Sequence, residues 1–151
     1  MRVDEASRFL AAEPDEVFRA FVDPALLLGW LPPEGMTGRL ESFDAHAGYR
    51  MVLRYLEPPA GGGKATADED IAEVRRVRVE PPELIVEEVD FASDDPAFAG
   101  TMTMTWTFTE GDGGTYVEVA ARGVPDGIDP ADHAAGMASS LRNLARLVEG
   151  G

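Results

Sequence analysis

The stretch that decides the fold is Asp129-Pro130-Ala131-Asp132-His133-Ala134-Ala135-Gly136-Met137-Ala138-Ser139-Ser140-Leu141-Arg142-Asn143-Leu144-Ala145-Arg146-Leu147-Val148-Glu149. Asp129 is a good N-cap residue, and Pro130 suits the first position of a helix. Apolar side chains then recur at helical spacing, at Met137, Leu141, Leu144 and Val148. We expect one α-helix that ends at Gly150-Gly151 and spans roughly 30 Å, enough to cross a small domain.

The first half of this predicted helix carries unusually small side chains. Between residues 131 and 140 they are Ala131, Ala134, Ala135, Gly136, Ala138, Ser139 and Ser140. A glycine inside a helix costs about 1 kcal/mol relative to alanine. We therefore expect this half of the helix to leave space instead of filling it.

Composition places the chain among ordinary globular proteins and excludes several classes. Its 151 residues are 44% hydrophobic and 27% charged, which fits a single domain over residues 1–151. There is no run of eighteen apolar residues and no apolar leader, so we expect a cytoplasmic protein without a membrane span. The absence of cysteine excludes disulfides and cysteine-ligated metals. Thirteen basic and 28 acidic residues give a net charge of −15, which disfavours nucleic acid and anionic membranes as partners.

The rest of the chain is dominated by strand patterns. A strand over residues 2–12 is followed by two short helices, which begin at Glu13-Pro14 and at Asp23-Pro24. Period-two alternation then predicts six strands, at residues 36–43, 49–57, 70–80, 84–91, 101–109 and 115–122. In the clearest of these strands, Met102, Met104, Trp106 and Phe108 alternate with threonines. We therefore expect one face of the strand to be buried and the other to be exposed to solvent. The expected class is α+β, with a curved antiparallel sheet wrapped around the long C-terminal helix.

At this point the sequence resembles the SRPBCC (START-like, helix-grip) superfamily, in the branch of homologues of the activator of the heat-shock chaperone ATPase. The segments that carry the resemblance span the chain: residues 12–21, 30–36, 48–51, 81–86, 102–106 and 133–137. The resemblance implies a helix-grip fold with a deep cavity between the sheet and the C-terminal helix. Relatives use this cavity for hydrophobic ligands, and some are cyclases, hydroxylase components or co-chaperones. No catalytic motif defines the branch, so the resemblance assigns no catalytic residue.

Strand parity and the helix face supply the residues that we expect around this cavity. They are Trp30, Met51, Leu53, Tyr55, Arg75, Val77, Glu87, Val89, Met102, Met104, Trp106, His133, Met137 and Leu141. Methionine adapts to varied shapes, so several Met side chains on one concave face suit a pocket for apolar molecules. The alternative for each apolar member is that it simply fills the core.

Two charged residues of this set are expected to form a pair. In the predicted strand over residues 70–80, the alternation that places Val77 and Val79 on the inner face also places Arg75 there. In the next strand, over residues 84–91, the same alternation places Glu87 on the inner face. If the turn between the strands pairs residue 79 with residue 85, Arg75 lies diagonal to Glu87. Such a pair could orient the polar head of a ligand. The alternative is a β-bulge or strand end that returns these groups to water.

The two histidines do not predict a metal site. His133 lies four residues before Met137 on the same helix face, where it could be a general base, a ligand contact or a solvated side chain. His46 lies in a turn, and no acidic residue accompanies either histidine at ligand spacing. We expect no metal and no cofactor.

These observations leave three hypotheses of function. The first is binding of a small hydrophobic or amphipathic molecule in the cavity, without catalysis. The second is a co-chaperone-like interaction module that stimulates a chaperone ATPase. The third is a cyclase or hydrolase that uses His133, Arg75 and Glu87. The expected partners are a small hydrophobic molecule and, as alternatives, a second copy of the chain or a chaperone.

Overall fold

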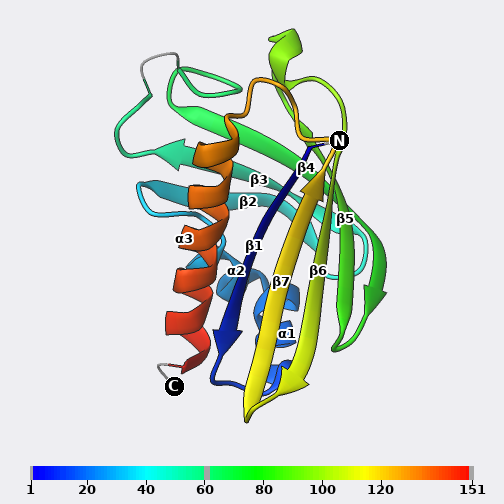
Figure 1. Ribbon diagram of the computed structural model, residues 1–151. Coiled ribbons are helices and arrows are strands. Elements are labelled where there is room, and N and C mark those ends of the chain that lie inside the picture. The colour runs from blue at the N-terminus through cyan, green and yellow to red at the C-terminus, as the bar shows by residue number, and fades with distance from the viewer. Residues whose placement is uncertain (1, 60–61, 150–151) are drawn as a thin grey trace.

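The computed structural model describes residues 2–59 and 62–149, which form a seven-stranded sheet and three α-helices (Figure 1). In chain order these elements are β1 (Val3–Leu10), α1 (Pro14–Val22), α2 (Pro24–Trp30), β2 (Met36–Asp44), β3 (Gly48–Tyr55), β4 (Glu69–Glu80), β5 (Leu84–Phe91), the 3₁₀ turn η1 (Pro96–Phe98), β6 (Met102–Gly111), β7 (Gly114–Arg122) and α3 (Pro130–Glu149). The predicted α+β class is confirmed, with two short helices after the first strand and a long helix at the end.

The sheet is antiparallel throughout and is curved around α3. Its strand order is β1-β7-β6-β5-β4-β3-β2, so that the first strand lies beside the last one. α3 crosses one face of the sheet, with β1 next to it, and the two short helices lie near the C-terminal half of α3 (Figure 1). Since one face of the sheet is covered and the other faces water, its strands show the expected alternation.

Aspartate caps begin two of the helices as the sequence predicts. The Asp129 carboxylate accepts a hydrogen bond from the backbone N–H of Asp132 at 3.0 Å, at the start of α3. Asp23 accepts from the backbone N–H groups of Ala25 and Leu26 at the start of α2. Each cap satisfies N–H groups that have no partner within the helix.

The C-terminal half of α3 packs on a filled core. Leu141 and Leu144 are fully buried. Beside them, the Phe21 ring lies 4.6 Å from that of Trp30 and 5.0 Å from that of Trp106, between ring centres. Such tilted aromatic pairs stabilise a core beyond the area that they bury. This half of α3 therefore attaches the helix to the hydrophobic core.

The small polar residues of α3 have a role that the sequence analysis missed. Ser139 Oγ accepts from the backbone N–H of Glu34 at 2.8 Å, and Ser140 Oγ donates to the Leu31 carbonyl at 2.7 Å. Asn143 donates to the carbonyls of Trp30 and Pro32. The serines therefore fix the segment after α2 against the helix, and they are not there merely to leave space.

A β-bulge in β4 corrects the predicted orientation of two site residues. Val79 pairs with Ile85 as predicted, but the register shifts between Arg76 and Arg78. Val77 is the extra residue, and it is 54% exposed. One extra residue reverses the alternation of the side chains that precede it. The inward orientation expected of Arg75 and Val77 is therefore wrong, and Arg76 faces inward in their place. The alternative of a β-bulge is confirmed for Arg75, which is exposed, whereas Glu87 stays buried.

Within the two described ranges, no helix is both long and apolar enough to span a membrane.

Candidate functional site

A cavity of about 450 Å³ lies between the sheet and the N-terminal half of α3. Ten of the predicted site residues line it: Met51, Leu53, Tyr55, Glu87, Val89, Met102, Met104, Trp106, His133 and Met137. Further lining comes from Leu31, Pro33, Met36, Tyr49, Pro59, Lys64, Asp70, Ala72, Val74, Phe91, Ile128, Asp132, Gly136 and Ser140. Most of these side chains are apolar, and they come from β3, β4, β5, β6 and α3.

Four predicted site residues lie elsewhere. Trp30 and Leu141 belong to the filled core under the C-terminal half of α3, and neither lines the cavity. Arg75 and Val77 are exposed, and Arg75 pairs with Asp90 at 2.8 Å on the outer face of the sheet. The predicted pair between Arg75 and Glu87 does not form.

Gly136 marks the point where α3 faces open space. A Cβ atom built on this glycine would have no neighbour within 4 Å. Met137, the next residue, also lines the cavity. The helix thus changes along its length from a face that borders empty volume to one that is packed.

The inner end of the cavity carries a buried ion pair. Arg76 Nε donates to Glu87 Oε2 at 3.1 Å, and Trp106 Nε1 donates to Glu87 Oε1 at 3.1 Å. The Arg76 guanidinium also donates to the carbonyls of Ala45 and Phe21. Burial raises the pKa of Glu87 above its ordinary value, although the nearby Arg76 acts in the opposite direction. A carboxylate held in this way presents acceptor capacity to a cavity whose lining is mostly apolar.

A second polar group lies where the loop after β3 returns to the sheet. Asp70 accepts from Tyr55 Oη at 2.6 Å, from the backbone N–H of Lys64 at 2.7 Å and from Lys64 Nζ at 2.9 Å. The Lys64 ammonium also lies 5.1 Å from the centre of the Phe91 ring, in cation–π range. Burial, together with the bond to Asp70, raises the pKa of Tyr55. These contacts hold the loop against the cavity.

A third polar group joins β1 to the first turn of α3. His133 Nδ1 lies 2.8 Å from Asp4 Oδ2, and Arg2 donates to both oxygens of the same carboxylate. The Arg2 hydrogen bonds, with a smaller contribution from His133, lower the pKa of Asp4. When His133 donates its Nδ1–H to Asp4, Nε2 is left as the acceptor of the ring. An aspartate that fixes a histidine at a cavity is an arrangement suited to proton transfer.

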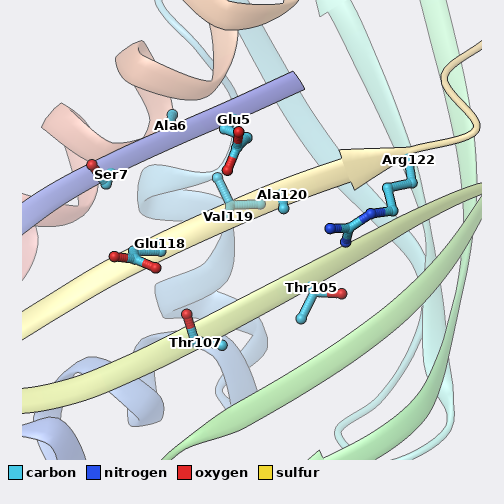
Figure 2. Close-up of a pocket in the computed structure, with 9 residues that line it drawn as sticks. All are labelled: Glu5, Ala6, Ser7, Thr105, Thr107, Glu118, Val119, Ala120 and Arg122. Atoms are coloured by element: carbon cyan, nitrogen blue, oxygen red, sulfur yellow. The ribbon is translucent and has the colours of Figure 1, made fainter. Parts of the chain in front are cut away.

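A second hollow, of about 480 Å³, lies on the outer face of the sheet, over β1, β7 and β6 (Figure 2). Short side chains form it, among them Ser7, Thr105, Thr107 and Ala120, together with the exposed Glu5, Glu118 and Arg122. Its lining is more polar than that of the inner cavity, and its charged groups face solvent. The inner cavity, with an apolar lining and shielded polar groups, has the properties of a small-molecule site.

Strand alternation and helical spacing predict Glu87, Tyr55 and His133 in the lining, but not the polar groups that contact them. Tyr49 shares the parity of Met51, so the alternation of β3 already pointed to it. Arg76 could not be found, because a bulge is not visible in the alternation. Asp4 and Asp70 meet their partners only through the folded topology. Among the residues that the structure describes, no three His, Asp or Glu side chains gather in a way that could hold a metal ion.

A curved antiparallel sheet that grips a long helix over an apolar cavity defines a protein of the START-like, helix-grip class. The chain belongs to the family described as activator of Hsp90 ATPase homolog 1-like protein, whose model matches residues 11–149.

Solved structures extend this assignment. Protein CV1439 from Chromobacterium violaceum is 32% identical, with a TM-score of 0.84, over 97% of this chain and 96% of that one. The AHSA1 protein from Silicibacter pomeroyi is 22% identical, with a TM-score of 0.75, over 95% of each chain. Protein MLL2253 from Mesorhizobium loti is 21% identical, with a TM-score of 0.74, over 99% of this chain and 98% of that one. The last two likenesses show the fold alone. A search of curated proteins found no match.

Proposed function

We propose that the protein binds a small hydrophobic or amphipathic molecule in the cavity between the sheet and α3. The observation that carries this proposal is the cavity itself, which has about 450 Å³ and a lining that is mostly apolar. Ligand pockets usually measure about 300–1,000 Å³ and combine apolar walls with a few placed polar groups.

Native mass spectrometry against a panel of fatty acids, sterols and aromatic polyketides tests the proposal. We expect one bound molecule per chain for at least one class, and a matching rise in melting temperature, because a ligand that binds only the native state stabilises it. Absence of binding across the whole panel, at concentrations up to the solubility of each compound, would contradict the proposal.

A co-chaperone role is the second candidate, because the matching family is described by an activator of the Hsp90 ATPase. This role predicts that the chain raises the ATPase rate of an Hsp90-class chaperone from the same cell. Measurement of that rate, with and without the protein, distinguishes the two functions, since an occupant of the cavity is not needed for it. An unchanged rate, together with no co-purification, counts against the co-chaperone role.

An enzyme is the third candidate, and the contact between Asp4 and His133 favours it. Turnover of 4-nitrophenyl esters by the purified protein, abolished in His133→Phe and reduced in Asp4→Asn, is the expected result for a hydrolase that uses this pair. If wild type and His133→Phe show the same background rate, His133 has no part in hydrolysis of these esters.

A further inference from the structure

The hydroxyl of Tyr49 is the least satisfied polar group at the inner end of the cavity. The residue is 7% exposed and lines the cavity. No residue in the ranges 2–59 and 62–149 forms a hydrogen bond with its Oη, whereas Tyr55 Oη, on the same face of β3, donates to Asp70 at 2.6 Å. Every enclosed side-chain polar atom of the described residues has a partner, so the Tyr49 hydroxyl opens onto the cavity. A hydroxyl that reaches this space can both donate to and accept from an occupant of the cavity.

Glu87 supplies a second polar group to the cavity. Trp106 Nε1 and Arg76 Nε each use one acceptor position on the carboxylate. A carboxylate has about four such positions, so acceptor capacity is left over. The residue is 3% exposed and lines the cavity. Asp70 accepts three hydrogen bonds from its own chain, whereas Glu87 accepts two. Glu87 therefore has more acceptor positions left for a ligand.

Arg76 brings these two groups to the same end of the cavity. Its guanidinium bonds to Glu87 and lies 5.5 Å from the centre of the Tyr49 ring. The sheet register agrees, because Tyr49 pairs with Val74 on β4, and Arg76, two residues further on, pairs with Glu87. The buried Glu87 charge also helps to raise the pKa of Tyr49, after burial itself. Tyr49 therefore stays a neutral hydroxyl, which can both donate and accept.

We propose that the cavity selects an apolar molecule with a hydrogen-bond donor, such as a hydroxyl group, at its inner end, and that Glu87 and Tyr49 hold that donor. This inference rests on the proposed ligand-binding function and gives its ligand a chemical class. As the partner of the Arg76 guanidinium, the Glu87 carboxylate accepts hydrogen bonds, so the ligand must supply the hydrogen. An anionic head group is disfavoured at this end, because it would meet Glu87 in a protein of net charge −15. The remaining walls, with Met51, Val89 and Met102, suit an apolar body.

Three fluorescent probes of nearly equal shape test the inference. They are 1-hydroxypyrene, which can donate and accept, 1-methoxypyrene, which can only accept, and pyrene, which does neither. We expect 1-hydroxypyrene to bind about tenfold more tightly than the other two at pH 7, since one net hydrogen bond of about 1.4 kcal/mol corresponds to a factor of ten. We expect Tyr49→Phe to remove most of that preference, and Glu87→Gln to reduce it, because the amide offers fewer acceptor positions than the carboxylate.

Tyr116→Phe is the matched control, because its hydroxyl lies on the outer face of the sheet and bonds to Asp112. It should leave all three affinities unchanged. Tyr49→Phe removes a group without a protein partner, so it should fold normally and can decide the question even if Glu87→Gln does not fold.

The outcomes separate this inference from the proposed function. Equal affinity of the three probes in wild type, or a Tyr49→Phe protein that keeps the preference, overturns the inference and leaves ligand binding standing. Failure of all three probes to bind, together with the negative panel described above, overturns both.

Discussion

At the scale of single residues, Arg76 and Glu87 form the most deeply buried ion pair of the described residues, with side chains that are 0% and 4% exposed. Removal of one partner from a buried pair leaves an uncompensated charge and costs about 3–5 kcal/mol. We expect Arg76→Leu to lower the free energy of unfolding by about this amount. Urea unfolding at pH 7 measures the change.

The neighbouring arginine provides the control. Arg75 is exposed and pairs with Asp90 and Glu88 on the outer face. Exposed pairs of this kind contribute little, so we expect Arg75→Leu to unfold at nearly the same urea concentration as wild type. The double variant Arg76→Leu/Glu87→Gln should recover part of the loss, because the buried charge is gone and Trp106 keeps an acceptor. Equal loss in Arg75→Leu and Arg76→Leu would contradict the bulge at Val77.

Asp4 gives the fold a defined dependence on acid. Its pKa is lower in the folded protein than the ordinary value of 3.8, chiefly because Arg2 donates to it. A lowered pKa contributes stability that is complete above the unfolded value and is lost as the pH falls through the folded value. We therefore expect the stability difference between wild type and Asp4→Asn to be largest near pH 7 and to shrink below pH 3.8.

Urea unfolding of both proteins across pH 3 to 7 measures this difference. Asp90 also has a lowered pKa, through Thr101 and Arg75, so both proteins will lose stability in acid. Asp90→Asn, altered on the outer face, therefore serves as the comparison. A difference for Asp4→Asn that stays constant over the whole range would mean that its contacts do not depend on charge.

At the scale of elements, α3 is divided at Gly136 into a half that borders the cavity and a half that is packed. Since a Cβ at Gly136 meets nothing within 4 Å, Gly136→Ala should raise the free energy of unfolding by about 0.5–1 kcal/mol. Gly136→Leu should also fold, but its side chain would occupy cavity volume. We expect it to weaken binding of 1-hydroxypyrene and pyrene alike.

Thermal unfolding and probe titration of the two variants check this pair of expectations. If Gly136→Leu unfolds while Gly136→Ala is stable, the space beside the helix is smaller than the structure indicates. If both variants bind probes as wild type does, the probes do not occupy this cavity.

The elements themselves could be predicted well, because their causes are local. The cap at Asp129, the helical spacing from Met137 to Val148 and the alternation from Met102 to Phe108 each follow from a short stretch of sequence. A β-bulge could be named as an alternative for this strand, but it could not be placed at Val77, since its position depends on the pairing with β5. The contacts of Ser140 with Leu31 and of His133 with Asp4 join residues more than a hundred positions apart, and only the folded topology brings them together.

At the scale of the whole molecule, acidic residues outnumber basic ones by 28 to 13. Several basic side chains on the sheet are paired with carboxylates, as in the contacts of Arg50 with Glu41 at 2.7 Å and of Arg75 with Asp90 at 2.8 Å. Such exposed pairs contribute about 0–1 kcal/mol each, and salt weakens them. The excess of negative charge acts in the other direction, because self-repulsion destabilises the compact state and salt relieves it.

We expect the excess of negative charge, more than the surface ion pairs, to determine how salt changes the free energy of unfolding. The screening length falls from about 30 Å at 0.01 M salt to about 8 Å at 0.15 M, which removes repulsion across the molecule while contacts below 4 Å are affected much less. We expect the stability to rise by about 1 kcal/mol over this range, or roughly 3 °C in Tm for a chain of this length. Thermal unfolding in NaCl, with KCl as the matched salt, measures it. A Tm that falls with salt would mean that the surface ion pairs contribute more to the fold than its net charge takes away.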